Sequence, residues 1–296
     1  MADRDDVKLD GVGRPEGEVS ASMSTEVEAS DPPWTCMALE RGLTLFSDLM
    51  SRVFFHGQNE LVAHLLRHVT GDKSIVITEV RTQVVYSNVN GRSAQLDIVA
   101  RDTKGTIYDI EVQSQREKSL INRAYFYGAT LLMNEVKAGT SFDEFPRVCV
   151  VFLLEHGEEC HGQLVERMNT YGTSGTRVDM PIDIYFVNGA LQDESELGTM
   201  MDDMRSSQLR QFKDRLFRER IDVLLCTDIG RRVMCEAERI WIEEVEADAL
   251  KRGREEEKRE IVRSMIAQNL DDNIITCTTG MPMARIQAMR HEMHML

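Results

Sequence analysis

The sequence predicts an α/β or α+β domain followed by a helical appendage. Two observations predict this class. Between Leu43 and Val187, the hydrophobic pattern changes from helical spacing to strand-like runs, back to helical spacing, and again to strand-like runs. After about Leu191, only helical patterns remain. This order of helix, strands, helix, strand, strand and helices defines the predicted class.

Composition divides the chain of 296 residues into four parts. Residues 1–33 combine Gly, Ser, Pro, Asp and Glu with few apolar side chains, so we expect a disordered acidic leader. The other predicted parts are a core over residues 34–190, a helical extension over 191–260, and a short helix-turn-helix tail over 261–296.

Composition also limits where the protein acts. The chain has no run of eighteen apolar residues, so we expect no membrane span. Its first residues are polar and acidic and lack the apolar stretch of a secretory signal. The six cysteines have no metal-ligand spacing, which indicates reduced thiols. Together these observations predict a cytoplasmic protein.

The first predicted elements are helices. Apolar residues recur at helical spacing over residues 43–69, and His56-Gly57-Gln58-Asn59 is expected to divide them into two helices. A short β-branched run over residues 74–80 predicts a strand.

A hairpin follows. Residues 93–101 and 106–114 alternate between apolar and polar side chains, as half-buried strands do. Asp102-Thr103-Lys104-Gly105 lies between them and is typical of a turn, so the two strands are expected to pair antiparallel.

The remaining elements complete the predicted order. Residues 116–137 are predicted as a helix, residues 147–154 as a fully buried strand, and residues 183–187 as a further strand. Amphipathic helices rich in methionine follow, including a charge-dense helix over residues 251–263. Because Met-rich helices suit adaptable contacts, these C-terminal helices are candidates for homo-oligomer formation.

The hairpin brings acidic side chains together. If its turn is centred near Lys104, Asp97 lies opposite Glu111, and Gln113 shares the face of Glu111. Two carboxylates roughly 5 Å apart repel each other, and a divalent cation such as Mg²⁺ or Mn²⁺ would turn that repulsion into coordination. The alternative interpretation is that these residues form the solvated face of an amphipathic hairpin.

The wider order of motifs resembles a nuclease family. A helix bearing Glu60 precedes a strand with Leu96-Asp97-Ile98, a glycine turn, Ile110-Glu111-Val112-Gln113, and a helix with Arg123-Ala124-Tyr125-Phe126-Tyr127. This arrangement resembles the PD-(D/E)xK nuclease superfamily, and within it the bacterial recombination-promoting nuclease or putative transposase families. The resemblance covers residues 43–190. It implies a restriction-endonuclease-like mixed sheet flanked by helices, and Mg²⁺-dependent cleavage of DNA.

The resemblance also implies roles for individual residues. Asp97, Glu111 and the backbone carbonyl of Val112 would bind the metal, and Gln113 would orient the attacking water. Many relatives have a lysine where this chain has Gln113, and a glutamine carries no charge, so it acts only through hydrogen bonds. Glu60 matches a helix-borne acidic position, although a solvent-exposed surface role explains it equally well.

Basic residues after the hairpin are candidates for DNA contacts. Arg116, Lys118 and Arg123 are expected either to contact phosphates or to be ordinary helix-surface charges. The predicted function is therefore a metal-dependent DNA endonuclease associated with recombination or mobile elements. The alternative is a catalytically weakened nucleic-acid-binding or interaction protein on the same fold. Gln113, the net charge of −15 and the long acidic leader favour this alternative.

Overall fold

Residues 42–87 and 91–294 are described by the structure, which is a computed structural model. The leader predicted over residues 1–33 lies outside the described residues. Within the described residues, no helix has the length and apolar character needed to cross a membrane.

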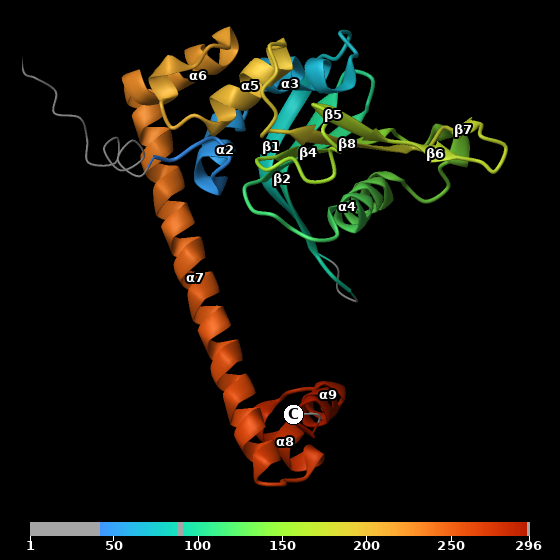
Figure 1. Cartoon of the computed structure of the whole chain (residues 1–296), viewed down its shortest axis with the longest axis vertical. Helices are drawn as coiled ribbons and strands as arrows, with labels where there is room; N and C mark the ends of the chain where they lie inside the picture. Colours follow the sequence, from blue (N-terminus) through green and yellow to red (C-terminus); the bar gives the residue numbers. More distant parts are fainter. Residues whose placement is uncertain (1–41, 88–90, 295–296) are drawn as a thin grey trace, which may run out of the picture. The chain divides into compact units, whose positions relative to one another are not determined.

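A mixed sheet forms the centre of the domain (Figure 1). Within the described residues it has six strands in the order β1-β2-β3-β4-β8-β5. At one edge, β1 pairs antiparallel with β2, which pairs antiparallel with β3 in the predicted hairpin. Strands β3, β4 and β8 run parallel, and β5 pairs antiparallel with β8 at the other edge. The strands are β1 (Ile77–Tyr86), β2 (Ala94–Asp102), β3 (Ile107–Gln113), β4 (Val148–Leu154), β5 (Val165–Met168) and β8 (Ile182–Asn188). The restriction-endonuclease-like class of mixed sheet with flanking helices is confirmed.

Helices cover both faces of this sheet (Figure 1). One face packs against α2 (Asp48–Phe55), α3 (Asn59–Thr70), α5 (Glu196–Arg205) and α6 (Arg215–Cys226). The opposite face packs against α4 (Leu120–Glu135). Short 3₁₀ turns, η1 (Phe142–Glu144) and η2 (Leu209–Gln211), and a two-stranded ribbon, β6 (Thr170–Tyr171) with β7 (Arg177–Val178), complete the domain.

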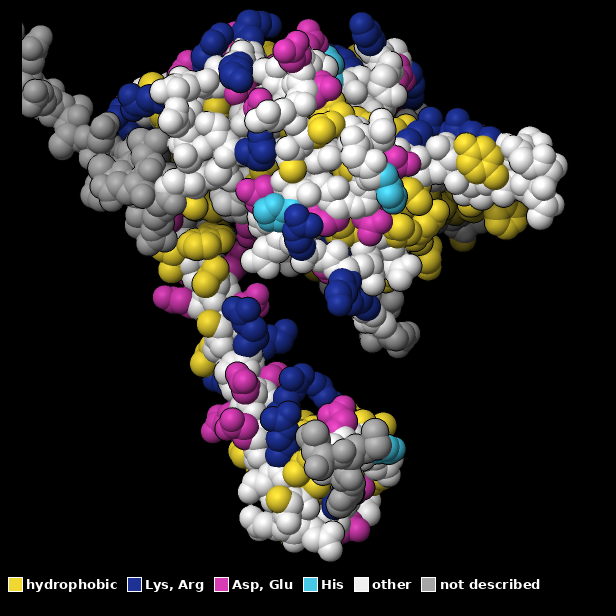
Figure 2. All heavy atoms as spheres, in the orientation of Figure 1, with side chains coloured by type: hydrophobic (Ala, Val, Ile, Leu, Met, Phe, Trp, Pro, Cys, Tyr) yellow, Lys and Arg dark blue, Asp and Glu magenta, His cyan; other side chains and the backbone are white. Residues whose placement is uncertain are grey.

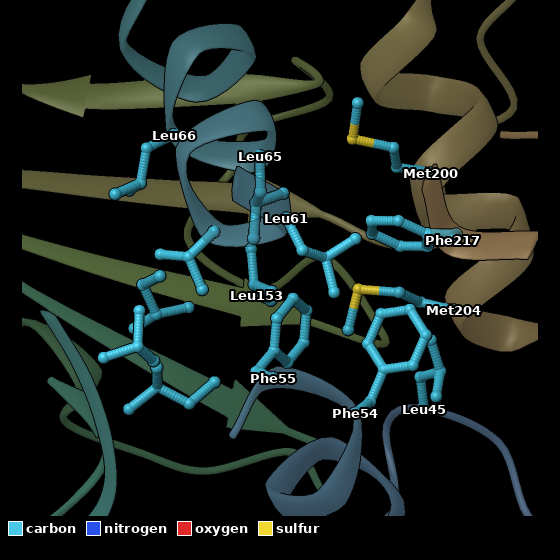
Figure 3. Close-up of a cluster of buried hydrophobic side chains, with 14 of the residues drawn as sticks. Leu45, Phe54, Phe55, Leu61, Leu65, Leu66, Leu153, Met200, Met204 and Phe217 are labelled. Atoms are coloured by element: carbon cyan, nitrogen blue, oxygen red, sulfur yellow. The ribbon is translucent and has the colours of Figure 1, made fainter. Parts of the chain in front are cut away.

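Aromatic side chains anchor the larger of the two cores (Figure 3). Phe54 lies edge-on to both Phe55 and Phe217, with ring centroids 5.0 Å apart in each pair. These rings join α2 to α6, and Met200 and Met204 of α5 point into the same cluster (Figure 3). Burying each of these aromatic side chains contributes about 2–3 kcal/mol, so α2 is held firmly over the sheet.

The C-terminal region is helical, as predicted. It contains α7 (Asp228–Ala267), α8 (Asp272–Thr279) and α9 (Met283–His294). From Cys235 to Ile261 every residue of α7 is exposed or half-buried, and Figure 2 shows basic, acidic and hydrophobic side chains interspersed along this helix. The end of α7 packs against α8 and α9 through a small core that includes Val262, Ile275 and Ile286.

Several predicted boundaries differ from the structure. The first strand runs to Tyr86 rather than ending at Val80, because Val84 and Tyr86 pack against the core on the α4 side. The helix predicted from Arg116 begins only at Leu120, because Ser119 adopts a left-handed backbone with φ of 69°. The short strands β5, β6 and β7 were not predicted from the sequence, since each has at most 4 residues and none is fully buried.

Candidate functional site

The β2–β3 hairpin has the register that the sequence predicts. Ile98 pairs with Ile110 and Arg101 with Ile107, which places Asp97 directly across from Glu111. The turn forms as expected, because Asp102 accepts hydrogen bonds at 2.8 Å from the backbone N–H groups of both Lys104 and Thr106.

Hydrogen bonds to side chains replace the backbone–backbone hydrogen bonds where the two hairpin strands separate. The backbone N–H of Asp97 donates to Oε1 of Glu111 at 3.0 Å. In return, the backbone N–H of Val112 donates to Oδ2 of Asp97 at 3.1 Å. Beyond this point β3 continues beside β4 as far as Gln113. The two carboxylates are therefore fixed to each other's strands at the fork between β2 and β3.

Arg123 supplies the positive charge at this fork. Its Nη2 donates to Oε2 of Glu111 at 3.0 Å, and its Nη1 donates to Glu117. The guanidinium lies over two aromatic rings, 5.0 Å from the centroid of Phe152 and 5.5 Å from that of Tyr127. These contacts hold Arg123 on the α4 side of the sheet, where it neutralises part of the acidic cluster.

Burial and mutual repulsion make the carboxyl groups unusually weak acids. Burial and the charge of Asp97 raise the pKa of Glu111 to about 8. Burial also raises the pKa of Asp97. Asp109 is fully buried two residues before Glu111 on β3, and burial with the charge of Glu111 raises its pKa well above the usual value. Within the described residues, neither carboxyl oxygen of Asp109 has a hydrogen-bond partner. The negative charge of this acidic cluster, formed by Asp97, Asp109 and Glu111, is therefore only partly balanced by positive charge.

The other residues predicted for the site lie in different environments. The side-chain amide of Gln113 donates to the backbone carbonyl of Gln115 at 2.8 Å. Arg116 and Lys118 are exposed in the loop between β3 and α4 rather than on the expected helix. Glu60 is not brought to the fork; it pairs with Arg67, and its side chain is 67% exposed.

The structure adds residues that the sequence analysis missed. Asp48 and Arg52 lie on α2, and their charges act on Asp97, since Asp48 raises its pKa and Arg52 lowers it. Arg52 donates to both carboxylate oxygens of Asp48, at 2.8 and 2.7 Å. Gln83 of β1 reaches the carboxylate of Asp97 from the other side. The spacing of four residues between Asp48 and Arg52 was the available sequence signal for this helix pair.

Comparison with known proteins identifies the domain. Residues 49–188 match the family model described as PD-(D/E)XK nuclease family transposase. These residues belong to that family. The match spans the sheet from β1 to β8 and includes both Asp97 and Glu111. Comparisons with curated proteins and with solved structures found no match.

A divalent metal is typical of the PD-(D/E)XK family, and the acidic cluster offers suitable donors. Carboxylate and carbonyl oxygens are the ligands that Mg²⁺ prefers, and Mg²⁺ is often held by one or two carboxylates together with substrate phosphates and waters. Within the described residues, no group of three His, Cys, Asp or Glu side chains is arranged to hold a metal. Asp97 and Glu111 supply carboxylates of the type that such a site uses, although Oε2 of Glu111 is already paired with Arg123. The unpartnered oxygens of buried Asp109 mark a cluster that lacks positive charge.

Proposed function

We propose that this chain is a metal-dependent DNA endonuclease associated with recombination or mobile elements. The observation that carries the proposal is the pair of carboxylates, Asp97 and Glu111, fixed at the fork of β2 and β3. Membership of residues 49–188 in a nuclease family of transposases supports it, because such a family implies DNA as the partner.

Each residue of the fork has a role in this proposal. Asp97, Glu111 and the backbone carbonyl of Val112 would hold Mg²⁺, or Mn²⁺ in its place. The bound cation would polarise the scissile phosphate and favour hydroxide over water at the site. Gln113 would orient the attacking water through its amide, which requires the amide to leave the carbonyl of Gln115.

The basic residues divide into two roles. Arg116 and Lys118 are exposed beside the fork, so they are proposed to contact phosphates of the DNA backbone. Arg123 is already held by Glu111 and Glu117, so we assign it the role of fixing Glu111. Glu60 has no role in this proposal because it is exposed and paired with Arg67.

Cleavage of plasmid DNA in the presence of Mg²⁺ tests the proposal. The variants Asp97→Asn and Glu111→Gln keep the side-chain volume and are expected to lower the cleavage rate about 100-fold or more. Asp143→Asn, a change of the same kind at an exposed residue of η1, serves as the control and is expected to cleave at the wild-type rate. Wild-type cleavage by both fork variants would contradict the site.

A second function, DNA binding by a weakened enzyme, is favoured by Gln113 and by the net charge of −15. A glutamine there provides no positive charge, which suits a weakened enzyme that binds DNA without efficient cleavage. Gln113→Lys distinguishes the two functions. If the chain is a weakened enzyme, the lysine variant should cleave much faster than the wild type. If Gln113 orients water in an efficient enzyme, the variant should cleave no faster.

A further inference from the structure

In both β1 and β2, the side chains that point to one face of the sheet switch to the other face at one pair of opposing residues. Val80 belongs to the core under α2 and α3, whereas Val84, four residues on, packs against the core under α4. In β2, Ile98 belongs to the first core and Leu96 to the second. Residues an even number apart on a regular strand share a face. The strands therefore rotate between these residues, where Gln83 lies opposite Asp97.

The backbone of Gln83 carries the distortion. Its φ is 55°, in the left-handed region that side chains other than glycine and asparagine rarely adopt. Thr82 pairs with Ile98 and Val84 with Leu96, so the ladder is kept on both sides of the distorted residue. Backbone strain of this kind persists only where the surrounding structure imposes it, and it is concentrated at functional sites.

Hydrogen bonds fix the direction of the Gln83 amide. Its Nε2 donates to Oδ1 of Asp97 at 3.4 Å, and its Oε1 accepts a hydrogen bond from the amide of Gln95. A carboxylate only accepts hydrogen bonds, so the amide nitrogen of Gln83 must face Asp97. The bond from Gln95 stabilises the same orientation, because it needs the oxygen of Gln83 on the other side.

The surroundings of Gln83 are not those of a core residue. Its side chain is half-buried and lines a groove of about 510 Å³ together with Arg52 and His56 of the α2 region and apolar residues of α7 such as Val233. The side chain of Gln83 is therefore partly accessible to solvent from this groove. The left-handed backbone of Gln83 accommodates the change of faces in β1, and in this conformation the amide of Gln83 reaches Asp97.

We propose that Gln83 is a positioning residue for Asp97, which helps to hold the Asp97 carboxylate in the orientation that the metal site requires. This inference rests on the proposed function. The bond from the Val112 N–H fixes Oδ2, and the bond from Gln83 fixes Oδ1, so the carboxylate is held at both oxygens. Outer-shell hydrogen bonds to metal-binding side chains typically change metal affinity or activity about 10–100-fold.

Gln83→Gly separates this role from a purely structural one. Glycine adopts the left-handed conformation without strain, so the melting temperature without metal should not fall. The apparent affinity for Mn²⁺, measured from the rise in melting temperature with Mn²⁺ concentration, should fall about 10–100-fold. The Mg²⁺ concentration that gives half-maximal DNA cleavage should rise accordingly.

Two further variants complete the test. Glu159→Gly relieves the same left-handed strain, at φ of 54°, in a turn elsewhere in the chain and should leave Mn²⁺ affinity and cleavage unchanged. Gln83→Asn tolerates the left-handed backbone but is one methylene too short to reach Asp97, so it should lose affinity as the glycine variant does. If the glycine variant does not fold, the asparagine variant decides the question.

The outcomes distinguish this inference from the proposed function. If wild-type Mn²⁺ binding is lost in Asp97→Asn but unchanged in both Gln83 variants, Gln83 has no positioning role while the metal site stands. If the wild type shows neither Asp97-dependent Mn²⁺ binding nor cleavage, the proposed function is wrong and this inference is overturned with it.

Discussion

Nη2 of Arg123 lies 3.0 Å from Oε2 of Glu111 and binds that buried carboxylate from the α4 side of the sheet. Glu111 is only 2% exposed, so water does little to stabilise its charge. Arg123 therefore balances part of the negative charge of Glu111, as a bound divalent cation would also do. The charge state of the fork depends on which cations surround it.

Replacing Arg123 with alanine should destabilise the metal-free protein in a pH-dependent way. At pH 9, where Glu111 is largely ionised, the loss in free energy of unfolding should be about 3 kcal/mol, because a buried carboxylate is left without its partner. At pH 6 the loss should be smaller, since Glu111 is then protonated. Urea unfolding at both pH values measures the difference.

Mn²⁺ and a conservative variant provide controls for this prediction. Mn²⁺ should stabilise Arg123→Ala more than the wild type, because the cation replaces the missing charge. Arg123→Lys should recover part of the lost stability. An equal loss at pH 6 and pH 9 would show that the arginine acts by packing alone.

Glu111 should also impose its own pH dependence on the metal-free protein. Burial and the charge of Asp97 raise the pKa of this carboxyl group to about 8 from its ordinary value of 4.5. The folded protein thus binds more protons than the unfolded chain between these values, and its stability falls as the pH rises through that range. Glu111→Gln does not titrate, so it should gain stability relative to the wild type from pH 5 to pH 8.5. Thermal or urea unfolding across that range measures the gain, and parallel profiles would refute the shifted pKa.

Because α4 packs closely on the sheet, a larger residue at Gly128 should destabilise the fold. A Cβ at this glycine would lie 2.6 Å from Cγ2 of Ile182, a β-branched side chain of β8 that has little freedom to move. Gly128→Ala should therefore lower the free energy of unfolding by about 1–3 kcal/mol. Because the same helix carries Arg123, DNA cleavage should also fall.

Gly253 provides the matched control. It lies inside α7 with no atom within 4 Å of the position a Cβ would take. Alanine is the better helix former, so Gly253→Ala should raise the stability of α7 by about 0.5–1 kcal/mol. Urea unfolding of both variants tests the contrast, and a stabilised Gly128→Ala would mean that α4 does not approach β8 closely.

Local patterns were sufficient to predict the hairpin and its register. Alternation along two runs and a turn with Asp102 and Gly105 determine which residues face each other, because every contact involved is close in sequence. The order of helical and strand-like runs predicted an α/β or α+β class with a helical appendage, and the family resemblance predicted the mixed sheet flanked by helices. The pairing of Asp97 with Glu111 already suggested a divalent cation, and the family resemblance added the carbonyl of Val112 as a ligand and Gln113 as the residue that orients water.

Contacts between distant segments were not predictable in the same way. The charges of Asp48 and Arg52 act on Asp97 only because the aromatic core fixes α2 over the sheet. The left-handed backbone of Gln83 contradicts its local strand pattern, so no propensity indicates it. Glu60 matched a motif position by sequence, whereas the structure turns it outward to Arg67.

Calorimetric titration of the wild-type protein with Mn²⁺, beside Asp97→Asn and Glu111→Gln, tests the paired-carboxylate site most directly. The account predicts one Mn²⁺ bound per chain in the wild type, and binding at least about 10-fold weaker in each variant. Equal Mn²⁺ affinity in all three proteins would contradict it.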